Sequence, residues 1–97
     1  MLGEFDFGTR KLPAHMRRGA IDYLTKGLRP GSFLYKTLSN DLVGAFGRAD
    51  DVNILHMREW AEWLYNSCPR DAWGSEEKVE AWIDRASRNQ GLDEEND

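Results

Sequence analysis

The chain has 97 residues, of which 40% are hydrophobic, and its formal net charge is −4. This length suits one domain with one hydrophobic core. A single cysteine, Cys68, cannot form an internal disulfide, which favours a reducing compartment such as the cytoplasm. No apolar run approaches the roughly 18 residues of a membrane span, and the amino terminus lacks the basic start and apolar run of a signal peptide. We therefore expect a soluble intracellular protein without a membrane partner.

The charge is distributed unevenly along the chain. Residues 1–36 carry seven Lys/Arg against three acids, whereas residues 37–97 carry six against fourteen. On the helix that we expect after Pro13, Arg18, Asp22 and Lys26 follow one another at spacings of four, so this row partly neutralises itself. Nucleic-acid binding depends on neutralising phosphates with a basic surface. The pattern therefore argues against a nucleic-acid partner.

The first two predicted elements are an arm and a helix. Residues 1–12 form the arm, in which Phe5 and Phe7 alternate with acids and should pack on the helices. Pro13 suits the first turn of a helix that ends near Lys26. The expected inner side of this helix is Met16, Ala20, Tyr23 and Leu24, and Gly27 is its stop.

The longest apolar repeat predicts a second helix over residues 32–48. Its inner stripe repeats at spacings of three and four, with Ser32 as the expected N-cap, Gly47 as the stop and Asp50 as the cap of the next helix. Ser39, Asn40 and Asp41 are poor helix formers in its interior. The members of the predicted stripe are Leu34, Leu38, Leu42, Ala45 and Phe46.

A cluster of polar side chains is predicted at the junction of the second and third helices. Asp41 lies at the border of the apolar stripe and needs a partner, for which Arg48 is the nearest basic residue. One interpretation is that the cluster only fixes the angle between the helices. The other is a small-ligand or nucleotide site. Its candidate ligand-binding residues are Ser39, Asn40, Asp41, Arg48, Asp50 and Asn53.

The third helix is predicted over residues 51–67. Its inward stripe should contain Ile54, Met57, Trp60, Ala61, Leu64, Tyr65 and Cys68. Trp63 falls outside this stripe, with Val52, His56 and Glu59 on its side of the helix. Either the arm or the fourth helix covers Trp63, or this flank is a protein-binding surface or a contact between copies. His56 and Glu59 have no third ligand in the pattern, so we expect no metal site.

The fourth helix should begin after the capping residue Ser75 and end at Gly91. Val79, Trp82, Ile83 and Ala86 form its inner stripe, and residues 92–97 are expected to be a disordered acidic tail. The outer face is acidic and is either solvated or able to bind a basic protein surface. Its members are Glu76, Glu77, Glu80 and Asp84.

Three blocks of the sequence share their order and spacing with a known group of proteins. PGSFLYKTLSNDLVGAFGRADD, LYNSCP and WGSEEKVEAWID resemble small helical proteins of bacteriophages and prophages that carry a PGGFL…VLSNDL…RAD…YN…P…CWGS…W pattern. The similarity covers roughly residues 13–83 and departs from the pattern at Ser32 and Ala72. It implies a phage-type origin and action in the bacterial cytoplasm, and it supplies no catalytic residue.

The sequence therefore predicts an all-α domain of about four helices over residues 13–91. We expect a protein that is not an enzyme and needs no cofactor, since no motif places a nucleophile beside its base. The predicted function is binding of a host or phage protein, as an accessory factor or a counter-defence inhibitor. The alternative is a ligand site around Asn40, Asp41 and Arg48.

Overall fold

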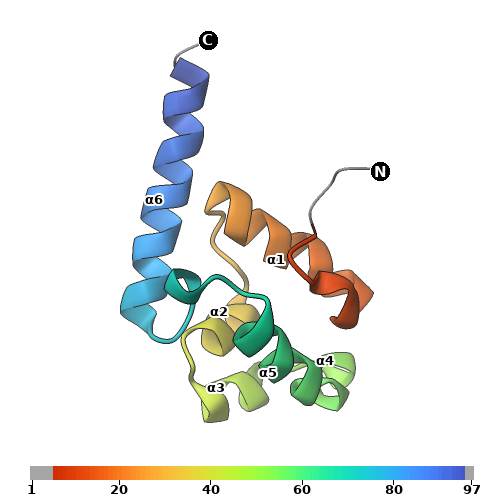
Figure 1. The fold of residues 1–97 in the computed structure, drawn as a ribbon. Coiled ribbons are helices and arrows are strands. Elements are labelled where there is room, and N and C mark those ends of the chain that lie inside the picture. Colours follow the sequence, from red (N-terminus) through yellow and green to blue (C-terminus); the bar gives the residue numbers. More distant parts are fainter. Residues whose placement is uncertain (1–5, 96–97) are drawn as a thin grey trace.

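The computed structural model describes residues 6–95, with the side chains of residues 89–95 left out, and its regular structure in this range is entirely helical (Figure 1). The predicted all-α class is confirmed. More helices are present than the four expected, because two of the long predicted helices are interrupted. The α-helices are α1 (Ala14–Lys26), α2 (Ser32–Leu38), α3 (Leu42–Arg48), α4 (Asp51–Leu55), α5 (Met57–Asn66) and α6 (Glu76–Glu95), and the 3₁₀ helices are η1 (Thr9–Lys11) and η2 (Arg70–Ala72).

The first helix lies where the sequence predicts it. Pro13 is the N-cap of α1, and Gly27 follows the helix in the left-handed region at φ 69°. The amide of Gly27 donates to the carbonyl of Tyr23, and the amide of Leu28 donates to that of Asp22. The bond from Gly27 to Tyr23 is that of an αL C-terminal motif, which needs a residue that tolerates positive φ.

The predicted helix over residues 32–48 is two helices. Asn40 adopts a left-handed conformation at φ 65°, and the amide of Asp41 donates across the turn to the carbonyl of Lys36. Asp41 then caps α3 by accepting from the amide of Gly44 at 2.9 Å. The residues that looked like weak helix formers thus act as a stop and a start signal. As a result α3 folds back against α2 (Figure 1).

Both predicted ends of this stretch also differ from the structure. Gly31, not Ser32, occupies the N-cap position of α2, and no side chain caps that end. At the other end α3 continues through Gly47 to Arg48. The prediction for Asp50 is confirmed, because its carboxylate accepts from the amide of Asn53 at 2.7 Å.

The predicted third helix is interrupted at His56, which separates α4 from α5. The interruption shifts the helical phase, so one stripe cannot continue from Ile54 to Tyr65. The buried side of α5 is Trp60, Trp63 and Leu64. Ile54 and Tyr65 are exposed, contrary to the prediction, and Tyr65 has 82% of its surface accessible.

The centre of the core is a cluster of aromatic rings. Trp60 meets both Phe33 and Trp63 edge to face, with ring centroids 5.3 Å and 5.8 Å apart. Such pairs add roughly 0.5–1.5 kcal/mol beyond the burial of their area. The buried indole N–H of Trp60 donates to the side-chain oxygen of Asn53 at 3.1 Å. A buried donor of this kind is costly to leave unpaired, so Asn53 is a structural residue of the core.

The last helix begins as predicted, with the Ser75 hydroxyl accepting from the amide of Lys78 at 3.2 Å. Val79 is fully buried, and the indole of Trp82 donates to the carbonyl of Tyr23 on α1. In the structure α6 passes through Gly91, where a stop was predicted, and extends away from the other helices (Figure 1). The predicted acidic tail is thus partly within α6, and its last two residues, like residues 1–5 of the predicted arm, lie outside the described range.

The contact between α1 and α6 depends on the absence of a side chain at Gly27. A Cβ atom there would lie 2.6 Å from both the carbonyl oxygen of Ile83 and the amide nitrogen of Ser87. Both atoms belong to the backbone of α6 and cannot move independently of the helix. Gly19, in the middle of α1, has nothing within 4 Å of the corresponding position.

We expect Gly27→Ala to lower the free energy of unfolding by at least about 2 kcal/mol, because the substitution adds left-handed strain to a clash with α6. Gly19→Ala is the matched control and should raise it by about 0.5–1 kcal/mol through helix propensity. Chemical denaturation followed by circular dichroism measures both. Equal stability of Gly27→Ala and the unsubstituted protein would contradict the close packing of α6 on this turn.

Candidate functional site

The flank predicted around Trp63 is not an exposed surface. Trp63 is only 2% exposed, and its indole N–H donates to the carbonyl of Phe7 at 2.8 Å. The segment around η1 packs on α5 and covers the ring, which is the alternative that the sequence left open. Val52 is exposed, whereas His56 and Glu59 are partly buried. These four residues therefore do not form the docking face that the helical spacing indicated.

The predicted polar cluster is divided between two places. Asp41 pairs with Lys36, at 3.5 Å between carboxylate and ammonium, and not with Arg48. Asn40 and Asp41 border a groove between α3 and α5, whereas Arg48, Asp50 and Asn53 line a different pocket. The two groups of residues lie apart because the turn at Asn40 prevents α3 from continuing along the axis of α2. Ser39 is partly buried, and its hydroxyl oxygen has no hydrogen-bond partner among the described residues.

The pocket beside Arg48 has a volume of about 280 Å³ and lies between α1, the start of α2 and the start of α4. His15 contributes its Nε2 atom, 2.9 Å from a carboxylate oxygen of Asp50. The pKa of Asp50 is lowered, first because its carboxylate accepts from the amide of Asn53 and second because of His15. Arg48 is exposed at the wall of this pocket. The arrangement offers cationic and carboxylate groups to a small polar ligand.

The acidic outer face of α6 is exposed as predicted, but Glu80 already has partners. Arg29 donates two hydrogen bonds to its carboxylate, at 2.8 Å and 2.9 Å, and the Tyr35 hydroxyl donates a third at 2.5 Å. The bond from Arg29 and then that from Tyr35 lower the pKa of Glu80 to about 2. Asp84 pairs with Arg88 on the same helix at 2.7 Å. Glu76 and Glu77 remain as exposed acids.

A mainly apolar groove lies between α3 and α5 and has a volume of about 300 Å³. We name it the α3–α5 groove. Its floor is formed by the edges of core residues on α2 and α5, and two exposed side chains of α3 form one wall. The residues that line it are Thr37, Asn40, Asp41, Leu42, Ala45, Phe46, Met57, Arg58, Trp60, Ala61 and Leu64.

The helices α3 and α5, and α4 between them in the sequence, carry exposed apolar side chains. Val43, one residue after the wall residue Leu42, is 83% exposed. Tyr65 follows the lining residue Ala61 by four positions, so it lies on the same face of α5 one turn further on. Seven of the eight large hydrophobic residues that are exposed in the described chain lie between positions 42 and 65. They are Leu42, Val43, Phe46, Val52, Ile54, Leu55 and Tyr65, and the eighth is Leu28.

The sequence analysis assigned Leu42, Phe46 and Tyr65 to the core, and so it did not identify this surface. The available signal was the Ser39-Asn40-Asp41 tripeptide, in which an Asn that tolerates positive φ precedes an N-cap Asp. A helix that restarts at Leu42 has a new phase. Its apolar residues therefore no longer align with those of α2.

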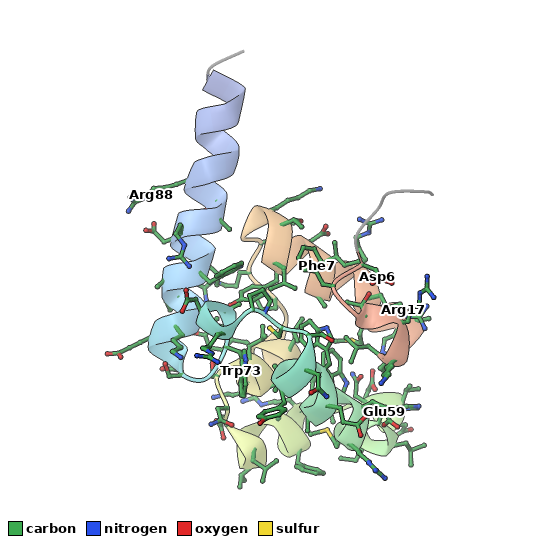
Figure 2. The ribbon with its side chains drawn as sticks, viewed as in Figure 1. Asp6, Phe7, Arg17, Glu59, Trp73 and Arg88 are labelled. Atoms are coloured by element: carbon green, nitrogen blue, oxygen red, sulfur yellow. The ribbon has the colours of Figure 1, made fainter. Side chains whose placement is uncertain are left out.

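The described residues contain no group of three or more His, Cys, Asp or Glu side chains that could hold a metal ion. Burial raises the pKa of the Cys68 thiol to about 12, so this residue is protonated at neutral pH. Figure 2 shows the polar side chains mainly around the outside of the helices, with labelled charged residues such as Arg17, Glu59 and Arg88 on different elements. None of the described helices is both long and apolar enough to cross a membrane.

No family model, no curated protein and no solved structure matches the chain.

The pKa of Glu80 predicts a pH dependence of stability. Since this pKa is lower in the folded chain than its ordinary value of 4.5, the contribution of the carboxylate is complete above about pH 4.5 and disappears as the pH falls toward 2. The melting temperature of Glu80→Gln should lie below that of the unsubstituted protein at pH 7, and the difference should shrink across this window. Glu77→Gln, on the same helix, should show no such trend. A difference that is constant with pH would contradict the assignment.

Proposed function

We propose that this protein acts by binding another protein, and that the α3–α5 groove with its surrounding apolar side chains is the contact surface. The observation that carries the proposal is the concentration of exposed Leu, Val, Ile, Phe and Tyr residues on α3, α4 and α5. Monomeric proteins seldom expose contiguous apolar patches larger than a few hundred Å² unless the patch binds something.

The groove provides the features of an anchor site. It is concave and mainly apolar, and the core residues Trp60 and Leu64 support its floor, so a side chain inserted there would meet a rigid surface. Burying apolar area contributes about 25 cal/mol per Å² before the cost of association is subtracted. Charged side chains at the edge, such as Arg58 and Asp41, provide a polar rim.

The nature of the partner is part of the proposal. The resemblance to small proteins of bacteriophages and prophages favours a host or phage protein in the bacterial cytoplasm. An accessory or inhibitory role by surface contact suits this chain. Its described residues contain no metal-ligand group, and its Cys68 thiol is buried and protonated. The exposed acids Glu76 and Glu77 on α6 could add attraction to a basic surface.

A negative charge placed at the exposed Val43 should abolish binding of the partner protein. We expect immobilised Val43→Asp to lose the protein that the unsubstituted chain captures from a bacterial lysate, because the substitution buries an unpaired carboxylate in the contact. Leu28→Asp is the control, since Leu28 is also an exposed apolar residue, at 52%, but lies in the turn after α1. Mass spectrometry identifies the captured protein, and circular dichroism confirms that both variants are folded. Identical capture by all three proteins would refute this surface.

A second candidate function is small-ligand binding in the pocket that contains His15, Arg48 and Asp50. The observation that favours it is an exposed Arg48 at the wall of a pocket of about 280 Å³, beside an established His–Asp pair. A guanidinium in such a place suits phosphate or carboxylate groups. Asn40 and Asp41, which the sequence grouped with Arg48, lie at the α3–α5 groove and do not belong to this candidate.

A thermal-shift screen with nucleotides and inorganic phosphate tests the second candidate. A ligand present at about 100 times its dissociation constant should stabilise the protein by about 2.7 kcal/mol. Arg48→Ala should lose this stabilisation, whereas Arg58→Ala, which lies at the α3–α5 groove, should keep it. Absence of any shift at millimolar ligand would exclude these ligands from the pocket.

A further inference from the structure

We infer that the α3–α5 groove is occupied by α3 of a second copy of this chain, so that the free protein is a two-fold symmetric homodimer. The inference rests on the proposed function in one respect, since both assign a contact to the same apolar surface. The inference goes further than the proposed function, because it names a second copy of this chain as the molecule that occupies the groove.

The shape of the surface suits a second copy. In a two-fold contact the same patch meets itself, so it must contain both a projection and a recess that fit each other. Here α3 supplies both features. Leu42 and Phe46 form a wall of the groove, while the neighbouring Val43 projects from the helix with 83% of its surface exposed. The α3 helix of one copy can therefore lie along the groove of the other while its own groove receives the partner's helix.

The charges beside the groove also suit a second copy. Two ion pairs lie beside the groove, one between Lys36 and Asp41 at 3.5 Å and one between Arg58 and Glu62 at 3.4 Å. Each pair is locally neutral, so an identical surface can approach without net repulsion. The chain as a whole has a net charge of −4, and its outer α6 face carries the exposed acids Glu76 and Glu77. An identical copy is repelled at α6 and tolerated at the groove.

The available area also suits a dimer. A stable interface needs about 800 Å² from each partner, which is roughly an eighth of the 6512 Å² surface of this chain. Four exposed apolar residues belong to the two helices that form the groove, and a contact over the groove would cover them. They are Leu42, Val43, Phe46 and Tyr65, with 65%, 83%, 45% and 82% of their surfaces accessible. A small domain with a limited core gains proportionally more stability from such burial than a large one does.

Self-association would also regulate the proposed function. A foreign protein that uses the same groove must compete with the second copy, so its apparent affinity falls as the concentration of this chain rises. The dimer is then the resting form, and the monomer is the form that binds a partner.

Sedimentation equilibrium over a concentration series tests the inference. The unsubstituted chain should be a dimer that dissociates on dilution, Val43→Asp should weaken dimerisation by at least about tenfold, and Leu28→Asp should leave it within about twofold. Hydrogen exchange provides a second measurement. The amides of α3 and α5 should become more protected as the concentration rises, while those of α1 do not.

A chain that is monomeric at hundreds of micromolar would overturn the inference. A dimer that Val43→Asp leaves intact would also overturn it. The same holds for a dimer in which the amides of α1 or α6, but not those of α3, become more protected from hydrogen exchange. The proposed function fails separately. If the unsubstituted chain captures no partner but forms a dimer that Val43→Asp weakens, only the foreign partner is refuted. If the chain is a monomer and captures a partner that Val43→Asp loses, only the dimer is refuted.

Discussion

The requirement that buried indole N–H groups find acceptors determines how the helices are assembled. Trp60 donates to Asn53 at the end of α4, Trp63 donates to the carbonyl of Phe7 before η1, and Trp82 donates to the carbonyl of Tyr23 on α1. Each bond joins two elements that are separate in the structure. An unpaired donor in this position would cost about 1–3 kcal/mol. The rings of the three tryptophans therefore contribute apolar packing, and their N–H groups form hydrogen bonds between elements.

The same constraint generates the surface on which both proposals depend. When Trp60 and Trp63 both point inward, α5 must turn its opposite side outward, which exposes Ala61 and Tyr65. The break at His56 allows this rotation, because α5 no longer has to follow the phase of α4. On the other side of the groove the turn at Asn40 frees α3 from the phase of α2. The groove is thus a direct consequence of two interrupted helices packing around two indoles.

The acidic helix α6 has a separate attachment with a different physical basis. It approaches α1 at Gly27, where only a residue without a side chain fits. Its charged side is held by Arg29 and Tyr35, which share the carboxylate of Glu80. One of the acids that the sequence offered as a binding residue therefore serves the fold. The carboxyl end of α6 projects away from the helices that carry the apolar surface (Figure 1).

Local interactions are what the sequence by itself determined. The helical class, the limits of α1 between Pro13 and Gly27, and the caps supplied by Asp50 and Ser75 all follow from hydrogen bonds and backbone conformations within a few residues. The tertiary structure alone decided which side of α5 is buried, because apolar residues occur on more than one side of that helix and periodicity cannot choose between them. It also decided that Arg48 and Asp41 lie apart, and that Phe7 covers Trp63 from 56 positions away. These outcomes depend on contacts between distant segments, for which helical spacing contains no information.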